Sequence, residues 1–375
     1  METLWSRTLS CGTLSVIPTG ADTRFDELFE VAERRNPKRA FLFVSKVLGR
    51  HIPVAPAKMR QVYRQLSQRL PALDHGPVLF IGMAETAVGL GAGVFDEARH
   101  QAQQPVYLTS TRHPQAAELL CEFKENHSHA TDHLIYLPEN TELRQRVLNA
   151  RTLVLIDDEA TTGNTFINLL QALRQEGGLN QIERVITVTL TDWSGDALTE
   201  RSPLPVHAVS LAQGSWQWLA DPAAPLPEMP AASLHTSSDV PLIGKQSWGR
   251  LGMKAPAADL GCHIQPQPGE KILVLGSSEF VWEPFLLAER LAALGAEVKY
   301  SSTTRSPIAS GFAIESIIAF NDNYGLGIAN FVYNVAHQRF DRILLCIETP
   351  ESSVDPQLLT ALQQVATHVE VICYD

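Results

Sequence analysis

"VLIDDEATTGNTF", residues 154–166, joins three kinds of sequence in one short segment. Apolar β-formers lead into two adjacent carboxylates, Asp157 and Asp158, and a run of Thr, Gly and Asn then leads into an amphipathic stretch that starts at Phe166. This order predicts a buried strand, a loop and a helix. In an α/β protein the loop after a parallel strand lies at the carboxyl edge of the sheet, where ligands bind.

The chemistry of this loop fits a sugar phosphate. A helix N-terminus offers unpaired amides and the positive end of a dipole, which suit a phosphate, and Gly163 permits an unusual backbone angle there. The two aspartates are poor phosphate ligands but good acceptors for sugar hydroxyls, directly or through a divalent cation such as Mg²⁺. The segment therefore predicts a ribose 5-phosphate site; the alternative is a capped helix after an acidic turn.

Strand-like runs recur along the first 218 residues with helical spacers between them. They cover residues 77–83, 105–110, 133–137, 151–158, 184–193 and 206–211. Several are apolar throughout, which is typical of strands covered on both faces, so we expect an α/β fold with a mostly parallel sheet.

The character of the chain changes after Trp218. A Pro/Ala/Ser-rich stretch reads as a linker or an irregular wrap, and strand and helix patterns resume near residue 269, with a helix expected over 323–338. We therefore predict a first domain over 1–218, a linker or wrap over 219–268 and a second, smaller α/β, Rossmann-like domain over 269–375.

Composition narrows the class of protein. The chain has 375 residues, 45% hydrophobic and 19% charged, as expected for globular domains, and a formal charge of -11. That charge, without any Lys/Arg-rich run, argues against a nucleic-acid partner. The five cysteines are scattered and form no CxxC pair, which fits a reducing compartment. The sequence shows no apolar run near about 18 residues and no secretory signal pattern. We therefore expect a cytoplasmic protein without a membrane partner.

"VLIDDEATTGNT" resembles the phosphoribosyl diphosphate (PRPP) motif of the type I phosphoribosyltransferases. The resemblance implies that Asp157 and Asp158 hold the ribose and, indirectly through ribose and pyrophosphate, Mg²⁺ as cofactor. It implies PRPP binding by the whole motif: Asp157, Asp158, Glu159, Ala160, Thr161, Thr162, Gly163, Asn164 and Thr165.

Two positions depart from the motif. Thr161 stands where the hypoxanthine-guanine type has an aspartate that contacts the purine, which brings the loop closer to the orotate type. Glu159 stands where the motif normally has an apolar residue.

The resemblance extends to segments 36–54, 80–93, 125–133 and to "TTRSPI" at 303–308. Together they are similar to an orotate phosphoribosyltransferase-like family whose C-terminal partner is the TRSP domain, named for the letters of residues 304–307. This family is bacterial, is associated with tellurium-resistance and stress gene clusters, and is thought to act in a nucleotide-like biosynthetic pathway. Since phosphoribosyltransferases are often dimers, a homodimer is expected.

The loop after the predicted strand 77–83 is the second candidate site. In phosphoribosyltransferases a loop at this position cradles pyrophosphate, which implies roles for Gly82, Met83, Ala84, Glu85 and Thr86. Close helix packing by small residues is the equal alternative. A dinucleotide fingerprint fits poorly, because Val94 stands where its third glycine belongs.

A short basic stretch holds Lys46, Arg50 and His51. The resemblance implies a pyrophosphate role for Lys46, whereas chemistry alone favours a lysine that snorkels from an amphipathic helix.

A polar segment between two predicted strands contains Arg112, Lys124, His127 and His129. We predict a catalytic loop that closes over PRPP, in which Arg112 and Lys124 neutralise pyrophosphate and a histidine donates a proton. Metal binding by His127 and His129 lacks an evident third ligand, and an ordinary surface loop remains open.

The second domain repeats the strand, loop and helix order. Its candidate ligand residues are Ser277, Ser278, Thr304, Arg305 and Ser306, since an arginine flanked by hydroxyls can bind a phosphate or carboxylate. A structural docking domain is the alternative.

Two tryptophans, Trp216 and Trp218, lie at the end of the first domain. We expect them to pack in the core rather than to stack on a base.

The sequence thus predicts a phosphoribosyltransferase that uses PRPP and Mg²⁺ to modify an unidentified base-like acceptor. The rival hypothesis is a non-catalytic PRPP-sensing regulator or scaffold, which would keep the acidic pair and the phosphate loop but lack a functional closing loop.

Overall fold

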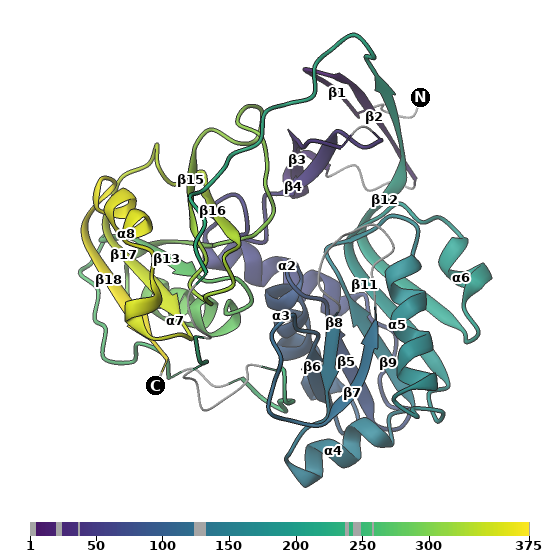
Figure 1. Cartoon of the computed structure of the whole chain (residues 1–375). Coiled ribbons are helices and arrows are strands. Elements are labelled where there is room, and N and C mark those ends of the chain that lie inside the picture. Colours follow the sequence, from purple (N-terminus) through teal and green to yellow (C-terminus); the bar gives the residue numbers. More distant parts are fainter. Residues whose placement is uncertain are drawn as a thin grey trace.

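The computed structural model describes residues 5–19, 25–36, 38–123, 133–236, 240–242, 249–256 and 259–374. They form two α/β units, each built on a parallel sheet, and a small β-rich layer at residues 5–45 that we call the cap (Figure 1). The predicted α/β class with a largely parallel central sheet is confirmed, and the C-terminal region is a further sheet-rich unit. None of the helices in this described part of the chain is long and apolar enough to cross a membrane.

The first sheet has the order β1-β2-β12-β11-β9-β5-β6. Its parallel part consists of β5 (Val78–Gly82), β6 (Val106–Thr109), β9 (Thr152–Ile156), β11 (Arg184–Asp192) and the first half of β12 (Val206–Ala220). The chain runs from β5 outward to β6 and then returns to β9 on the other side of β5. The carboxyl ends of β5 and β9 therefore flank the point where the strand order reverses, which is where open α/β sheets bind ligands.

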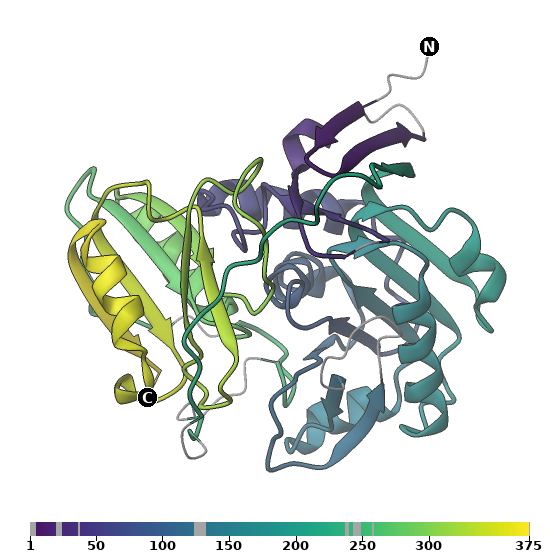
Figure 2. The same cartoon turned by 45° about the horizontal axis from the view of Figure 1, so that its top comes forward.

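The buried strands follow from their apolar runs. Leu153, Val154, Leu155 and Ile156 of β9 are fully buried, as expected for a strand covered on both faces. The connecting helices are α2 (Pro56–Gln68), α3 (Val88–Ala98), α4 (Thr141–Leu148), α5 (Asn164–Gln175) and α6 (Ala197–Arg201). Helices α2 and α3 lie between the first sheet and the C-terminal unit, and α5 lies away from that unit (Figure 2).

The predicted strand at 133–137 is not part of this sheet. It forms β8 (His133–Tyr136), which pairs antiparallel with β7 (Leu119–Phe123).

The cap contains β1 (Trp5–Leu9), β2 (Gly12–Pro18), α1 (Phe25–Leu28), β3 (Phe29–Glu33) and β4 (Phe41–Ser45). Strand β2 pairs antiparallel with the second half of β12, so one continuous strand belongs to both the parallel sheet and the cap. The rings of Trp216 and Trp218 lie with their centroids 5.0 and 5.2 Å from that of Phe41. Both tryptophans are half-buried and pack against the core of this layer.

The second sheet has the order β14-β13-β17-β18 and is parallel throughout. It contains β13 (Lys271–Gly276), β14 (Glu297–Ser302), β17 (Phe340–Ile347) and β18 (Ala366–Cys373), with helices α7 (Trp282–Ala293) and α8 (Pro356–Gln363). As in the first sheet, the strand order reverses beside the first strand of the unit, here between β13 and β17.

The helix expected over 323–338 is wrong. The structure has an antiparallel pair there, β15 (Ile317–Asn321) and β16 (Ala329–Tyr333). The Asp322 carboxylate accepts hydrogen bonds from the amides of Tyr324, Leu326 and Ile328 at 2.8–3.0 Å, which fixes the turn between the strands. A local side-chain acceptor of this kind competes with helix formation.

The segment between the two sheets wraps along the edge of the first one. Met253 exchanges backbone hydrogen bonds with Tyr107 of β6, and Gly249 accepts from the amide of Thr109. This wrap contains no helix or strand within the residues described between Asp221 and Glu270.

The two units share buried apolar surface. The rings of Tyr63 in α2 and Phe285 in α7 lie 5.4 Å apart, inside one core that extends through both units. A smaller cluster joins Val44 of the cap to Phe331 and Tyr333 of β16. The C-terminal unit is therefore packed against both the first sheet's helices and the cap.

The alternating glycines of α3 are explained by packing. A Cβ atom at Gly93 would lie 2.2 Å from the ring of Tyr63, and one at Gly91 would lie 2.7 Å from the Cα atom of Gly82. These glycines let α2 and β5 approach α3 closely, so they need no dinucleotide to account for them.

We predict that Gly93→Ala lowers the free energy of unfolding by about 1–3 kcal/mol, because the buried ring of Tyr63 has no room to give way. Gly89→Ala is the matched control in the same helix, since its Cβ atom would make only an ordinary 3.6 Å contact with Val281. It should be neutral or stabilising by up to about 1 kcal/mol. Urea unfolding measures both, and equal effects of the two substitutions would contradict the packing explanation.

Candidate functional site

The site lies at the carboxyl edge of the first sheet, where the loops after β5 and β9 meet. Gly82 and Ile156 are register partners, and the amide of Met83 donates to the carbonyl of Ile156 at 3.0 Å. The loop after β5 is thereby held directly beside Asp157.

Asp157 and Asp158 interrupt the pairing along β11. Both β9 and the short β10 (Glu159–Ala160) pair with β11, and the two aspartates form the irregularity between them. The amide of Asp158 donates to Asp157 Oδ1 at 2.9 Å. Both residues are partly exposed at the sheet edge rather than turned into the core.

Burial raises the pKa of Asp158 to about 6, and the charge of Glu159 adds to the rise. The carboxylate is therefore predominantly ionised above neutral pH and becomes protonated in mildly acidic solution. An ionised carboxylate is the form that accepts hydrogen bonds from sugar hydroxyls.

The loop before α5 has the geometry of an anion site. Gly163, which has no side chain to cap the helix, occupies the N-cap position of α5 in the left-handed conformation, with φ 72°, and the Thr162 hydroxyl accepts from the amide of Asn164 at 3.4 Å. Thr161 is partly exposed and Thr162 is exposed. The first amides of α5 therefore point toward an accessible loop that carries two hydroxyl groups.

Glu159 faces the cap. Its Oε1 atom lies 2.6 Å from Nη2 of Arg39, and that guanidinium lies over the rings of Phe41 and Trp216 at 5.0 and 5.4 Å. The departure from the motif at Glu159 thus gives an ion pair that ties the cap to the candidate PRPP loop.

Glu85, in the loop after β5, is buried between two arginines. Arg50 Nη1 lies 3.1 Å from Oε1, and Arg305 Nε lies 3.4 Å from Oε2. Arg50 also donates to the carbonyl of Glu85 at 2.6 Å. The preceding peptide bond, Ala84-Glu85, is cis.

The amide of Ala84 in this loop donates to Ser110 Oγ at 2.9 Å, and Ser110 in turn lies 3.1 Å from His133 Nδ1. The loop after β5 is thus connected to the start of β8.

The loop after β6 binds the C-terminal unit through Glu279. The Thr111 hydroxyl and the Arg112 amide donate to this carboxylate at 2.6 and 2.8 Å, and Arg250 pairs with both Glu279 and Glu348. Although burial alone would raise the pKa of Glu279, the neighbouring His113 and Arg250 and these hydrogen bonds hold it at about 2. Glu279 is therefore ionised at neutral pH and joins the loop after β13 to the loop after β6.

The structure brings some of the predicted residues together and not others. Lys124, His127 and His129 lie outside the described residues. The Lys46 ammonium donates to the carbonyl of Asp26 in the cap at 2.5 Å, and Arg50 is the basic residue of that stretch that reaches Glu85. Arg112 is held at its backbone, and its buried Nε atom has no hydrogen-bond partner among the residues described.

The second-domain candidates surround the carboxyl edge of the second sheet. Ser277, Ser278 and Thr304 are buried there, Ser306 is exposed, and Arg305 reaches Glu85 in the first unit. The Ser278 amide donates to Thr303 Oγ1 at 2.9 Å.

Sequence reasoning missed Arg39, Arg250 and Glu348. Glu348 directly follows the buried strand β17, as Asp157 follows β9, so the same strand-end pattern could have identified it. Arg250 lies in the irregular wrap, where no local pattern distinguishes it.

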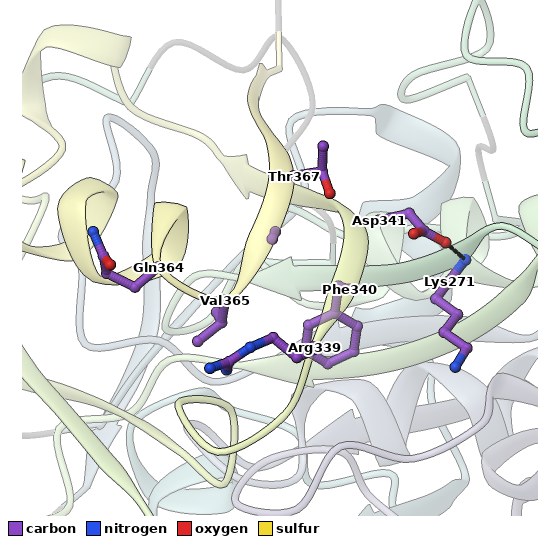
Figure 3. A pocket seen from close by; sticks show the side chains of 8 residues that line it. Lys271, Arg339, Phe340, Asp341, Gln364, Val365 and Thr367 are labelled. Atoms are coloured by element: carbon purple, nitrogen blue, oxygen red, sulfur yellow. Dashed lines mark hydrogen bonds between the residues drawn. The ribbon is translucent and has the colours of Figure 1, made fainter.

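A separate hollow opens at the amino edge of the second sheet (Figure 3). Its lining includes Arg339, Thr367 and Lys271, whose backbone amide donates to Asp341 Oδ2 at 2.8 Å. Because it lies at the opposite end of the strands from Ser277 and Arg305, it is not part of the candidate site.

Comparison with known protein families gives two matches. A family model described as phosphoribosyl transferase matches residues 28–215, half of the chain, and one described as the TRSP domain, C-terminal to that transferase domain, matches residues 247–364. The chain belongs to this phosphoribosyl transferase family. No curated protein sequence matches the chain.

Among solved structures, adenine phosphoribosyltransferase from Rhodothermus marinus is 18% identical, with 50% of this chain and 94% of that chain covered and a TM-score of 0.32. The Trypanosoma brucei enzyme, in complex with AMP, pyrophosphate and ribose-5-phosphate, is 12% identical, with 52% and 82% covered and a TM-score of 0.36. Orotate phosphoribosyltransferase from Aeropyrum pernix is 16% identical, with 47% and 80% covered and a TM-score of 0.27.

We predict that Gly163→Ala weakens ribose 5-phosphate binding by about tenfold or more, the loss of roughly one charge-assisted hydrogen bond. A Cβ atom there would lie 2.5 Å from Leu198 Cγ, so the loop must shift. Gly178→Ala is the control, because Gly178 also has a positive φ of 66° but nothing within 4 Å of a Cβ atom. Calorimetric titration measures the affinity of both variants for ribose 5-phosphate. If the two substitutions weaken binding equally, the clash with Leu198 is not the cause.

We predict that Asp158 makes the protein less stable as the pH rises from 4 to 6. Its folded pKa of about 6 lies above the ordinary value of 3.8, so the folded state retains a proton that the unfolded state has released. This lowers the free energy of unfolding of wild type at pH 7.5 by about 2 kcal/mol, after allowance for the partial exposure of Asp158. Asp158→Asn should remove that loss. Urea unfolding at pH 4 and pH 7.5 measures the free energy of unfolding of each protein. Asp221→Asn, at an exposed position, is the control. If the free energy of unfolding changes with pH equally in wild type and Asp158→Asn, the raised pKa is not that of Asp158.

Proposed function

We propose that this protein is a phosphoribosyltransferase that transfers the 5-phosphoribosyl group of PRPP to a base-like acceptor and releases pyrophosphate. One observation carries the proposal. The paired carboxylates Asp157 and Asp158 are partly exposed at the strand-order reversal of the first sheet, next to a helix N-terminus that begins with Gly163, in a chain of the phosphoribosyl transferase family.

Each part of PRPP has a matching element. The 5-phosphate binds the loop of Thr161, Thr162 and Gly163 and the first amides of α5, and the ribose hydroxyls donate to Asp157 and Asp158. The pyrophosphate then extends over the neighbouring loop after β5, because β5 and β9 are adjacent. The residues act by orientation and by charge stabilisation, not by attack on the sugar.

The reaction exchanges one bond at C1 of the ribose. The bond from C1 to the pyrophosphate oxygen breaks with its electron pair leaving on pyrophosphate, and an acceptor nitrogen or similar group bonds to C1 from the opposite face. A proton on the acceptor passes to a base that this proposal does not assign to a residue.

The residues present fit a magnesium ion held through the substrate. Asp157 and Asp158 offer partly exposed oxygen donors, the type that Mg²⁺ prefers, while no group of three or more His, Cys, Asp or Glu in the described chain could form a metal cage. Bound in this way, Mg²⁺ would neutralise charge on the departing pyrophosphate.

The acceptor faces the cap in this proposal. Arg39 pairs with Glu159 of the candidate PRPP loop, and its guanidinium lies 5.8 Å from the centre of the Phe43 ring, which stacks on Trp193 at 4.9 Å. Thr161 argues against a hypoxanthine-guanine type of acceptor. From the family resemblance we further propose a cytoplasmic homodimer that acts in a nucleotide-like pathway linked to tellurium resistance.

The rival function is a PRPP-sensing regulator or scaffold without catalysis. It requires the same sugar-phosphate contacts, so binding alone does not distinguish it from the enzyme. Release of pyrophosphate during turnover does distinguish the two.

We predict that the intact chain, with PRPP, Mg²⁺ and a panel of nitrogenous bases and carboxylated heterocycles, releases pyrophosphate with at least one acceptor. Asp157→Asn and Asp158→Asn should each lower this rate by about tenfold to a hundredfold, because each removes a charged contact to the ribose. Asp221→Asn, exposed and remote, should retain the rate. A coupled pyrophosphate assay measures all four proteins.

If PRPP binds but no acceptor yields pyrophosphate, the regulator hypothesis gains. If both aspartate variants bind PRPP as wild type does, the assignment of the site itself is wrong.

A further inference from the structure

The C-terminal unit places one arginine against the pyrophosphate loop of the first unit. We infer that Arg305 contacts the pyrophosphate of PRPP, so that both units build a single active centre. This inference rests on the function proposed above and adds a residue from the TRSP domain to it.

The position of Arg305 is fixed by bonds on both sides. Thr304 exchanges backbone hydrogen bonds with Phe331 at 3.0 and 2.8 Å, and the Tyr333 hydroxyl donates to the carbonyl of Ser306 at 2.7 Å. The loop after β14 is thus pinned to β16, and the guanidinium extends from a rigid base toward Glu85.

Glu85 pairs with two guanidinium groups in a poorly hydrated place. The side chains of Arg50, Glu85 and Arg305 are only 3%, 8% and 16% exposed. A guanidinium in such a place attracts a multiply charged anion more strongly than the same group in water.

The two arginines differ in what they already bind. Arg50 hydrogen-bonds to Glu85 and to the carbonyls of Ser278 and Thr303, at 2.6–3.1 Å. Arg305 makes an ion pair with Glu85 through Nε, and neither of its Nη atoms has a hydrogen-bond partner among the described residues. Its outer donors are therefore available in the fork geometry that matches phosphate oxygens.

The loop that carries Glu85 begins directly beside Asp157. Gly82 is the partner of Ile156 in the sheet, and the amide of Met83 donates to the carbonyl of Ile156 at 3.0 Å. Glu85 follows Gly82 by three positions in this loop. In this inference a pyrophosphate that leaves the ribose at Asp157 extends along the loop after β5 toward Arg305.

Docking of the two units does not need Arg305. The two units are already joined by the bonds of Glu279 with Thr111 and Arg112, by those of Arg50 with the carbonyls of Ser278 and Thr303, and by a shared apolar core. A purely structural role leaves the unbonded Nη atoms of Arg305 unexplained.

The test titrates the full chain with two probes, ribose 5-phosphate and inorganic pyrophosphate, in the presence of Mg²⁺. Arg305→Ala should weaken pyrophosphate binding by about tenfold or more, as for a lost charge-assisted contact, and leave ribose 5-phosphate binding unchanged. Arg305→Lys should restore part of the loss, since it keeps the charge but not the fork.

Two further variants guard against a folding artefact. Arg342→Ala is the matched control, because Arg342 is 20% exposed and ion-paired with Glu270 at the opposite end of the second sheet, and it should change neither affinity. Glu85→Gln should shift pyrophosphate affinity in the opposite direction, upward, because it removes the anion that competes for Arg305. A misfolded protein would not show a gain.

The outcomes separate this inference from the proposed function. If wild type binds both probes and Arg305→Ala alters neither affinity, or weakens both equally, the role of Arg305 is refuted while the phosphoribosyltransferase proposal stands. If wild type binds neither probe, the proposed function fails and this inference fails with it.

Discussion

The buried guanidinium of Arg50 is the interaction on which the arrangement of this protein depends. It bonds to the side chain and backbone of Glu85 in the loop after β5, and to two carbonyls at the strand ends of the C-terminal unit. A buried charge is tolerated only when it is paired and hydrogen-bonded. The loop after β5 and the loops after β13 and β14 must therefore remain together for Arg50 to remain satisfied.

Ion pairs between the two units support the same arrangement. Glu279, at the end of β13, accepts from the loop after β6, and Arg250 joins Glu279 to Glu348 at the end of β17. Loops at the carboxyl ends of strands in both sheets, the end at which α/β sheets bind ligands, are therefore in contact. The boundary between the two units in sequence is thus not a boundary in the core.

The features that could be predicted from the sequence are those that local residue patterns determine. Apolar runs located β5, β9, β11 and β13, and the change from carboxylates to small hydroxyl residues located the loop before α5. The helix expected over 323–338 was wrong, because hydrogen bonds to the Asp322 carboxylate fix a hairpin turn. The pairing of Glu85 with Arg50 and Arg305 joins residues far apart in sequence, so no periodicity or spacing could reveal it.

Strand β12 is shared between the parallel sheet and the cap, with β11 on its first half and β2 on its second. A hinged lid is joined to its domain by a flexible segment. Here the connection is a continuous strand with hydrogen bonds along its length, and the ion pair of Arg39 with Glu159 adds a second link. Rotating the cap away would break the ladder that carries it. The cap is thus fixed relative to the first sheet and to the loop that carries Glu159, so it cannot open as a hinged lid.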